Sequence, residues 1–202
     1  MTINYLSSSL GLVALVRLIV AQTPALATPS VNEILDHYVT ALGGRPALEK
    51  VTSMVMTGNI EFPTLKASGT IAEYFKYPDH FAAITQIADY GTVRTVYDGK
   101  TGWEMDPGRD PQQISGPELS DLRRRSDIHW DLKLKEFYPR LTVKGREKVN
   151  GKDAWKLDAT IDTWTYGFYF DVATGLLIRF DTDSSTPAGP SSVSIGDYRP
   201  VD

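Results

Sequence analysis

Histidine and carboxylate side chains are the residues of this sequence best suited to binding a metal ion or transferring protons. The three histidines, His37, His80 and His129, are far apart, and no two have the H-x-x-x-H spacing that turns two imidazoles to one side of a helix. The chain contains no cysteine, so a zinc site would need carboxylates gathered from distant elements. We interpret the histidines as ordinary residues and expect neither a metal site nor a cofactor.

Serines and glycine-rich segments offer no recognisable catalytic motif. A serine nucleophile needs a strained turn such as G-x-S-x-G or an adjacent base, and no G-x-S-x-G is present. Gly43-Gly44-Arg45-Pro46 lacks the length and the lysine of a phosphate-binding loop. Asp181-Thr182-Asp183 lacks the central glycine and closing glutamate of a calcium loop. We expect no catalytic residues, since an enzyme would need a site assembled from dispersed Asp, Glu and His.

Arg123-Arg124-Arg125 is the only run of like charges in the chain. Two interpretations are open: a solvated helix face, which we favour, or a site for an anionic ligand.

Aromatic side chains are the remaining candidates for a functional role. The chain has four tryptophans, ten tyrosines and seven phenylalanines, concentrated in segments with strand-like patterns. They could simply fill a core, or they could line an apolar ligand cavity inside a curved sheet. The candidates for such a lining are Phe75, Phe81, Trp103, Trp155, Trp164, Tyr166, Phe168, Phe170, Ile178 and Phe180.

Length and composition predict one domain. The chain has 202 residues, 42% of them hydrophobic, and a net charge of -4, which argues against nucleic acid as a partner. Residues 10–20 are apolar except for Arg17, and Ala25-Leu26-Ala27 has the small-x-small form of a cleavage site. This order predicts a secretory signal peptide over residues 1–27, a mature domain over residues 28–202, a periplasmic or secreted location, and no membrane span after cleavage.

The periodicity of apolar residues predicts two kinds of element. Ser30 and Glu33 form a capping box before a helix that ends at Gly43-Gly44, and residues 118–138 have helical spacing that predicts one or two further helices. Asp98-Gly99 and Asn150-Gly151 predict type I′ hairpin turns. Strands are predicted at residues 53–61, 66–76, 80–88, 92–97, 101–105, 112–115, 141–149, 152–160, 164–171, 176–182 and 192–198.

The later predicted strands are apolar on one face only. Trp164, Tyr166, Phe168 and Phe170 share one face, and Leu176, Ile178 and Phe180 are predicted to share another. Such a sheet needs a cover, and few helical residues are available to supply it. We therefore predict a mainly β (α+β) fold: a curved antiparallel sheet forming an unclosed half-barrel, with the first helix and the middle helices packed on or in its mouth.

Two segments resemble the periplasmic lipoprotein carriers of the LolA/LolB-like, outer-membrane lipoprotein-sorting type. They are D-G-K-T-G-W-E-M-D-P at residues 98–107 and F-K-Y-P-D-H-F at residues 75–81, the latter preceded by Gly69-Thr70-Ile71. Ala41-Leu42-Gly43-Gly44 and Y-F-D at residues 169–171 also resemble uncharacterised exported bacterial proteins of this kind. The resemblance implies an unclosed barrel with an apolar cavity for acyl chains, and a further strand or two beyond a truncated C-terminus.

Two functions follow as hypotheses. The first is a non-catalytic periplasmic carrier that binds lipid, the acyl chains of a lipoprotein or another apolar ligand, with lipid or acylated protein and an envelope protein as partners. The alternative is a structural or protein-interaction module whose core is solid and whose surface carries the function.

Overall fold

The computed structural model describes residues 27–161, 164–183 and 189–199. The predicted signal peptide lies outside the described residues, apart from Ala27. Four α-helices are present within the described part: α1 (Val31–Ala41), α2 (Arg45–Leu48), α3 (Gly116–Ser126) and α4 (Trp130–Phe137). A single 3₁₀ turn, Pro63–Leu65, joins the first two strands. The predicted helical region around residues 118–138 thus forms two separate helices.

All eleven strands of the described residues belong to one antiparallel sheet, as predicted. The first six are β1 (Ser53–Phe62), β2 (Ala67–Lys76), β3 (His80–Ile87), β4 (Gly91–Asp98), β5 (Gly102–Met105) and β6 (Gln112–Ile114). The last five are β7 (Thr142–Val149), β8 (Lys152–Ile161), β9 (Trp164–Asp171), β10 (Leu177–Asp183) and β11 (Ser191–Ser194).

The strand order joins two meanders through their first and last strands. It runs β6-β5-β4-β3-β2-β1-β11-β10-β9-β8-β7, so β1 pairs with β11 although their partners Ile60 and Val193 are distant in the sequence. Within the described residues, the two edges of the sheet are β6 and β7 and no strand pairing joins them, so the sheet is a half-barrel and not a closed barrel. β11 is shorter than the predicted strand at residues 192–198 and lies inside the sheet.

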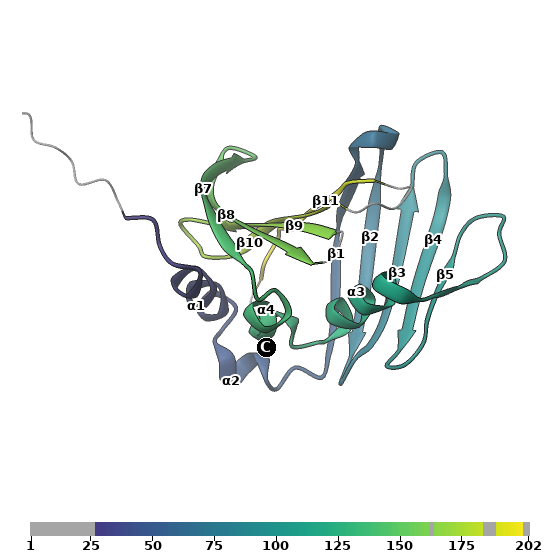
Figure 1. The fold of residues 1–202 in the computed structure, drawn as a ribbon, viewed down its shortest axis with the longest axis horizontal. Coiled ribbons are helices and arrows are strands. Elements are labelled where there is room, and N and C mark those ends of the chain that lie inside the picture. The colour runs from purple at the N-terminus through teal and green to yellow at the C-terminus, as the bar shows by residue number, and fades with distance from the viewer. Residues whose placement is uncertain (1–26, 162–163, 184–188, 200–202) are drawn as a thin grey trace, which may run out of the picture.

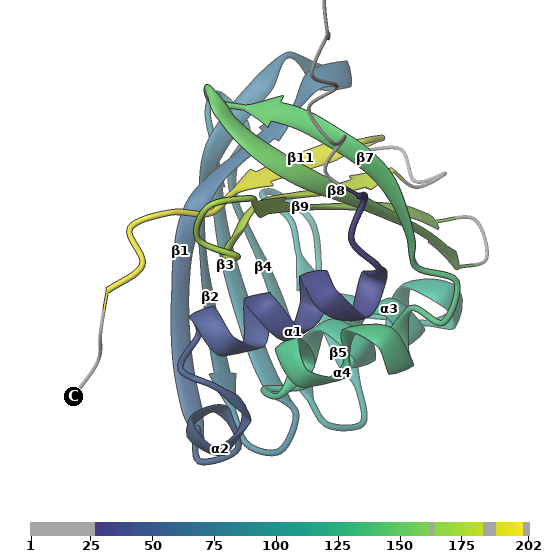
Figure 2. The ribbon, with the colours of Figure 1, turned by 90° about the vertical axis from the view of Figure 1, so that its left-hand side faces the viewer.

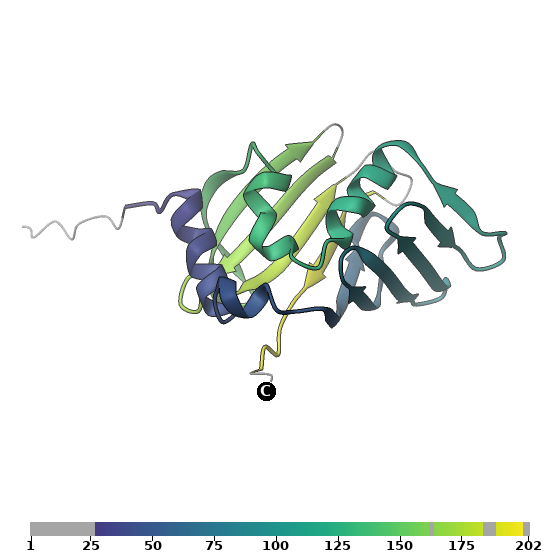
Figure 3. The same ribbon diagram turned by 90° about the horizontal axis from the view of Figure 1, so that it is seen from below.

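The helices lie on the concave side of this curved sheet. Figure 1 shows β2–β5 and β7–β10 as two walls, with α1, α4 and α3 between them near one end. The turned view in Figure 2 places α1 and α4 together below the arch of β7 and β8, and Figure 3 shows α3 and α4 lying across the sheet. Gly102 permits the close approach of α3, because a Cβ at this position would lie 2.6 Å from Leu122.

Local sequence signals explain where several elements begin and end. Ser30 and Glu33 form the predicted capping box at the start of α1, with the Ser30 N–H donating to Glu33 Oε2 at 2.7 Å. Asn150 and Gly151 both have positive φ, as a type I′ turn requires. The same prediction is wrong for Asp98, which lacks positive φ. Its carboxylate instead accepts the N–H groups of Lys100 and Thr101 and shapes a three-residue loop.

Candidate functional site

The concave face of β8–β10 is lined with aromatic rings. Tyr166 and Phe168 are 0% exposed and Phe170 is 1% exposed. The Phe168 ring lies 5.0 Å from the Tyr138 ring and 5.2 Å from the Phe180 ring, centroid to centroid. We call these residues, together with the others that α1 and α4 bury here, the C-terminal core. The helices contribute to it through Ile34, Leu35, Tyr38 and Leu134.

The structure brings six of the ten predicted cavity-lining residues into this region. Tyr166, Phe168 and Phe170 belong to the C-terminal core, and the half-buried Trp155, Trp164 and Phe180 pack against it. Their side chains are in contact with one another and with the helices.

Phe75 and Phe81 lie in a second cluster, the N-terminal core, on the concave face of the other wall. Their rings are 5.1 Å apart, and Leu122 of α3 covers them. The two predicted groups therefore face the same side of the sheet but lie under different helices.

Ile178 does not share a face with Phe180, and the predicted common face of Leu176, Ile178 and Phe180 is wrong. The pairing of β10 with β9 shifts between Leu177 and Arg179, which is a β-bulge. The extra residue reverses the alternation. Leu177 consequently joins the C-terminal core, whereas Ile178 packs on the convex face with Val149, Ala154 and Tyr169.

Trp103 also lies on the convex face. Tyr97 pairs with Gly102 and Val96 pairs with Trp103, so the indole points away from the concave side that holds Tyr97. The pairing of strands across the Asp98-Gly99 turn already implied this orientation of Trp103. It places the even-numbered residues of β5 on the face of Tyr97, and therefore Trp103 on the opposite face.

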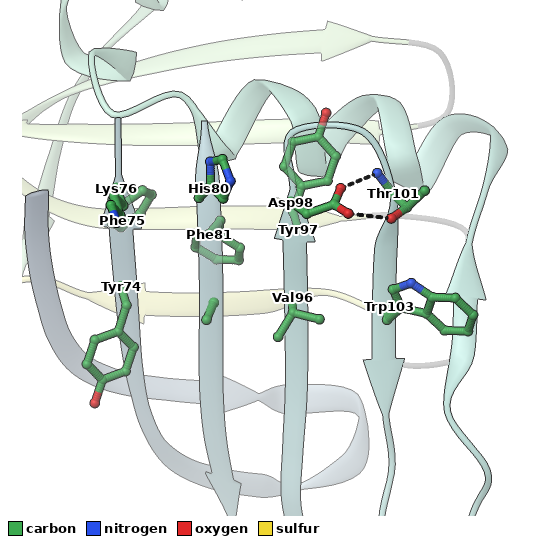
Figure 4. Close-up of a pocket in the computed structure, with 11 residues that line it drawn as sticks. Tyr74, Phe75, Lys76, His80, Phe81, Val96, Tyr97, Asp98, Thr101 and Trp103 are labelled. Carbon is green, nitrogen blue, oxygen red and sulfur yellow. Dashed lines mark hydrogen bonds between the residues drawn. The ribbon is translucent and has the colours of Figure 1, made fainter. Parts of the chain in front are cut away.

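A shallow pocket of about 400 Å³ lies where β2, β3, β4 and β5 run side by side. Figure 4 shows Tyr74, Val96 and Trp103 at about the same level on β2, β4 and β5, with the Asp98–Thr101 hydrogen bonds at the hairpin between β4 and β5. Phe75 and Phe81 are also among the residues that line this pocket, although their rings belong to the N-terminal core on the concave face. Tyr74 and Trp103 are 43% and 39% exposed, which leaves an apolar surface on the convex face.

The arginine run of α3 is not a solvated face. Asp121 has a side chain that is only 3% exposed, and it accepts a hydrogen bond from Arg125 Nε at 2.7 Å and from Tyr166 Oη at 2.6 Å. Arg124 Nη2 donates to Tyr166 Oη at 3.3 Å, while Arg123 is exposed and reaches Tyr97 Oη. The prediction that this run forms a solvated helix face is therefore wrong for Arg124 and Arg125.

Sequence reasoning missed this network, although a signal for it was present. Asp121 and Arg125 are four residues apart, the spacing of a helical ion pair, and Leu122 between them faces the N-terminal core. Asp121 and Leu122 are both buried in the structure. The network ties α3 to β9, on the opposite wall of the half-barrel.

A carboxylate on the other wall completes the polar network. Glu73 of β2 lies 4.0 Å from Arg125 and its side chain is 20% exposed. Burial raises the pKa of Glu73, and the positive charge of Arg125 opposes that rise. The neighbourhood thus holds two guanidinium groups and two carboxylates between the two walls.

Several buried polar atoms near α4 have no hydrogen-bond partner among the described residues: Arg124 Nε, His129 Nε2, Trp130 Nε1 and Tyr138 Oη. Burial raises the pKa of Tyr138 to about 12, with Asp121 adding to the effect and the Trp130 indole and the two arginines opposing it. Unpaired buried polar atoms are uncommon in folded proteins, so four within 15 residues of one another mark an unusual interface.

Helix α4 is joined to α1 by one further buried polar contact. The Tyr38 hydroxyl donates a hydrogen bond to Asp131 Oδ1. Burial raises the pKa of Asp131, although the Tyr38 hydrogen bond opposes the rise. The Asp131 carboxylate is therefore held in a buried position that disfavours its charged form.

Neither a metal site nor a membrane-spanning helix is found in the described ranges. No three His, Asp or Glu side chains gather there as ligands for a metal ion. No helix in the same part of the chain is long and apolar enough to cross a bilayer.

Comparison with known proteins finds likeness in fold only. No protein-family model and no curated protein matches the chain. It is similar to the lipoprotein LppX of Mycobacterium tuberculosis at 15% identity and a TM-score of 0.42, over 86% of this chain and 99% of that one.

Two further solved structures are similar. One is a putative outer membrane lipoprotein-sorting protein domain from Vibrio parahaemolyticus, at 14% identity and a TM-score of 0.38, over 81% of this chain and 92% of the other. The second is a LolA superfamily protein from Nitrosomonas europaea, at 12% identity and a TM-score of 0.35, over 85% and 96%.

Proposed function

We propose that this chain is a non-catalytic binding protein for an apolar ligand, an acyl chain, which it holds between the concave face of β8–β10 and the helices α3 and α4. One observation carries the proposal. The eight-residue helix α4 covers part of the aromatic face of the C-terminal core, and buried polar atoms of α3, of α4 and of the residues beside α4 have no hydrogen-bond partner in the part of the chain that the structure describes. Helices that leave polar atoms unsatisfied against a sheet fit it imperfectly, so a ligand can displace them.

The energetics of this exchange favour an acyl chain. Helix α4 has eight residues and buries mainly Leu134, with Trp130 and Phe137 half-buried. Burial of each methylene is worth about 0.8 kcal/mol, so a chain of about sixteen carbons contributes about 13 kcal/mol before the costs of ordering it. That gross contribution is large enough to offset the contacts that α4 loses when it moves away from Phe168 and Phe180.

The binding partners and the compartment belong to the same proposal. The apolar N-terminal run and the Ala25-Leu26-Ala27 site support export to the periplasm or beyond. An exported acyl-chain binder would receive its ligand from lipid or an acylated protein, and could pass it to an envelope protein.

Native mass spectrometry with lipid extraction tests this function. Mature protein, residues 28 onward, is purified from a bacterial periplasm and sprayed without denaturation. We expect a population heavier by the mass of a phospholipid, fatty acid or acylated peptide, and we expect the purified protein to take up the fluorescent apolar probe Nile red. A clean apo mass together with no uptake of Nile red would refute the proposal.

The alternative, a protein-interaction module, is favoured by the convex face. Val55, Tyr74, Val96 and Trp103 form a continuous row across β1, β2, β4 and β5 through the paired Ala82 of β3, and Val55 is 62% exposed. If the core takes up no apolar probe, this exposed row becomes the leading candidate for function.

A further inference from the structure

We propose that the contact around Tyr138 binds the polar end of the acyl ligand through a hydrogen-bond-accepting oxygen, either a carboxylate or an ester carbonyl. The inference rests on the proposed function and adds the place and the chemistry of the ligand's head group.

Three donors without acceptors carry this proposal. Tyr138 is 0% exposed, and its hydroxyl has no hydrogen-bond partner among the described residues. Trp130 Nε1 and Arg124 Nε are buried atoms that also lack a partner there, although the Trp130 and Arg124 side chains are partly exposed. An indole and a guanidinium can only donate, and a phenol donates readily. The group that would satisfy all three is therefore an acceptor.

The three donors lie around the same aromatic rings. Tyr138 is 4.9 Å from Tyr166, ring to ring, and Arg124 Nη2 binds the hydroxyl of Tyr166. Trp130 lies 5.9 Å from Phe168 and 6.4 Å from Tyr138. Arg124 belongs to α3, Trp130 belongs to α4, and Tyr138 follows directly after α4. These are the helices that the ligand must displace. His129 Nε2 is the fourth atom without a partner among the described residues, and the His129 ring lies 5.9 Å from the Tyr77 ring.

Two of the nearby carboxylates already accept hydrogen bonds from other side chains, and a third, Glu73, lies 4.0 Å from Arg125. Asp121 accepts from Tyr166, Arg124 and Arg125, and Asp131 accepts from Tyr38. A cationic head group would meet the positive charges of Arg124 and Arg125 at this place, where Asp121 is already taken by three donors. An acceptor oxygen would find three free donors next to rings that can pack against its alkyl chain.

Competition for bound Nile red by three ligands of equal chain length tests the inference. Laurate offers a carboxylate, methyl laurate an ester carbonyl, and dodecylamine a cationic donor. We expect wild-type protein to prefer laurate and methyl laurate over dodecylamine. The ratio of laurate to methyl laurate affinities then distinguishes a free fatty acid from an esterified lipid as the source of the oxygen.

The variants Tyr138→Phe and Trp130→Phe keep an aromatic ring and remove one donor each. Loss of one hydrogen bond predicts an affinity for the two oxygen-headed ligands that is about fivefold to tenfold lower, with dodecylamine unchanged. Tyr138→Phe should change the urea midpoint little, because the hydroxyl it removes has no hydrogen-bond partner of normal geometry among the described residues. Tyr97→Phe is the matched control: Tyr97 is equally buried, its hydroxyl accepts from Arg123, and it lies in the N-terminal core.

The outcomes separate the inference from the function beneath it. If all three ligands displace Nile red equally well, or if both variants keep the wild-type preference, the acceptor site is refuted while acyl-chain binding stands. If neither Nile red nor any of the three ligands binds, the proposed function fails and the inference fails with it.

Discussion

Truncation of Phe168 measures how tightly the concave face is packed in the free protein. Phe168 is fully buried, and its ring contacts Tyr138, Trp130 and Phe180 at centroid distances between 5.0 and 5.9 Å. Phe→Ala changes in a filled core cost about 3–5 kcal/mol. At a urea slope of about 2 kcal/mol/M, a loss of about 4 kcal/mol lowers the unfolding midpoint by about 2 M.

Phe180→Ala is the matched control for this measurement. Phe180 pairs with Phe168 in the register of β9 and β10, but it is only half-buried. Its truncation should cost about 1–2 kcal/mol, because less apolar surface is removed from contact. If Phe168→Ala costs less than about 1 kcal/mol, or no more than Phe180→Ala, the ring lines open space and the account of a helix-covered core is wrong.

Two further predictions concern the polar contacts of the helices. Burial holds the pKa of Asp131 above its unfolded value despite the Tyr38 hydrogen bond, so its contribution to stability is present below the unfolded pKa and is lost as pH rises through the folded one. Asp131→Asn should therefore be more stable than wild type at pH 7 in urea unfolding, and an advantage that did not shrink toward acid pH would contradict this reasoning. Asp121→Ala leaves Tyr166 and Arg125 without their acceptor and should cost about 2–3 kcal/mol, less than a fully buried pair because Arg125 is a third exposed. A loss below about 0.5 kcal/mol would show that the network does not hold α3 to β9.

The sequence predicts the elements well because their signals are local. The capping box at Ser30, the Asn150-Gly151 turn and the two-residue alternation each act over a few residues, and all eleven predicted strands occur. The pairing of β1 with β11 has no such signal, since it depends on how far the sheet curls before two distant strands meet. The bulge at Ile178 likewise depends on the partner strand, and because of it the predicted face of Ile178 is wrong.

The candidate site was predicted only in part for the same reason. Alternation identified Tyr166 and Phe168 as neighbours on one face, but it carries no information on the distance between a sheet and the helices above it. The polar partners came from α3 and α4, whose docking brings Arg124 and Trp130 onto those rings. Aromatic composition was compatible with a filled core and with a ligand cavity, and the structure places α1 and α4 against these rings.

The movement of α4 away from the sheet is the most direct test of whether an acyl chain binds between α4 and the concave face of β8–β10. Because the chain contains no cysteine, spin labels can be placed at Glu136→Cys on α4 and Thr165→Cys on β9, both exposed positions. A control pair at Lys152→Cys and Thr165→Cys lies entirely on the sheet. The account predicts that laurate lengthens the α4–β9 distance by about 4 Å or more, the thickness of one layer of carbon atoms, and leaves the control distance unchanged. An unchanged α4–β9 distance in protein saturated with laurate would contradict it.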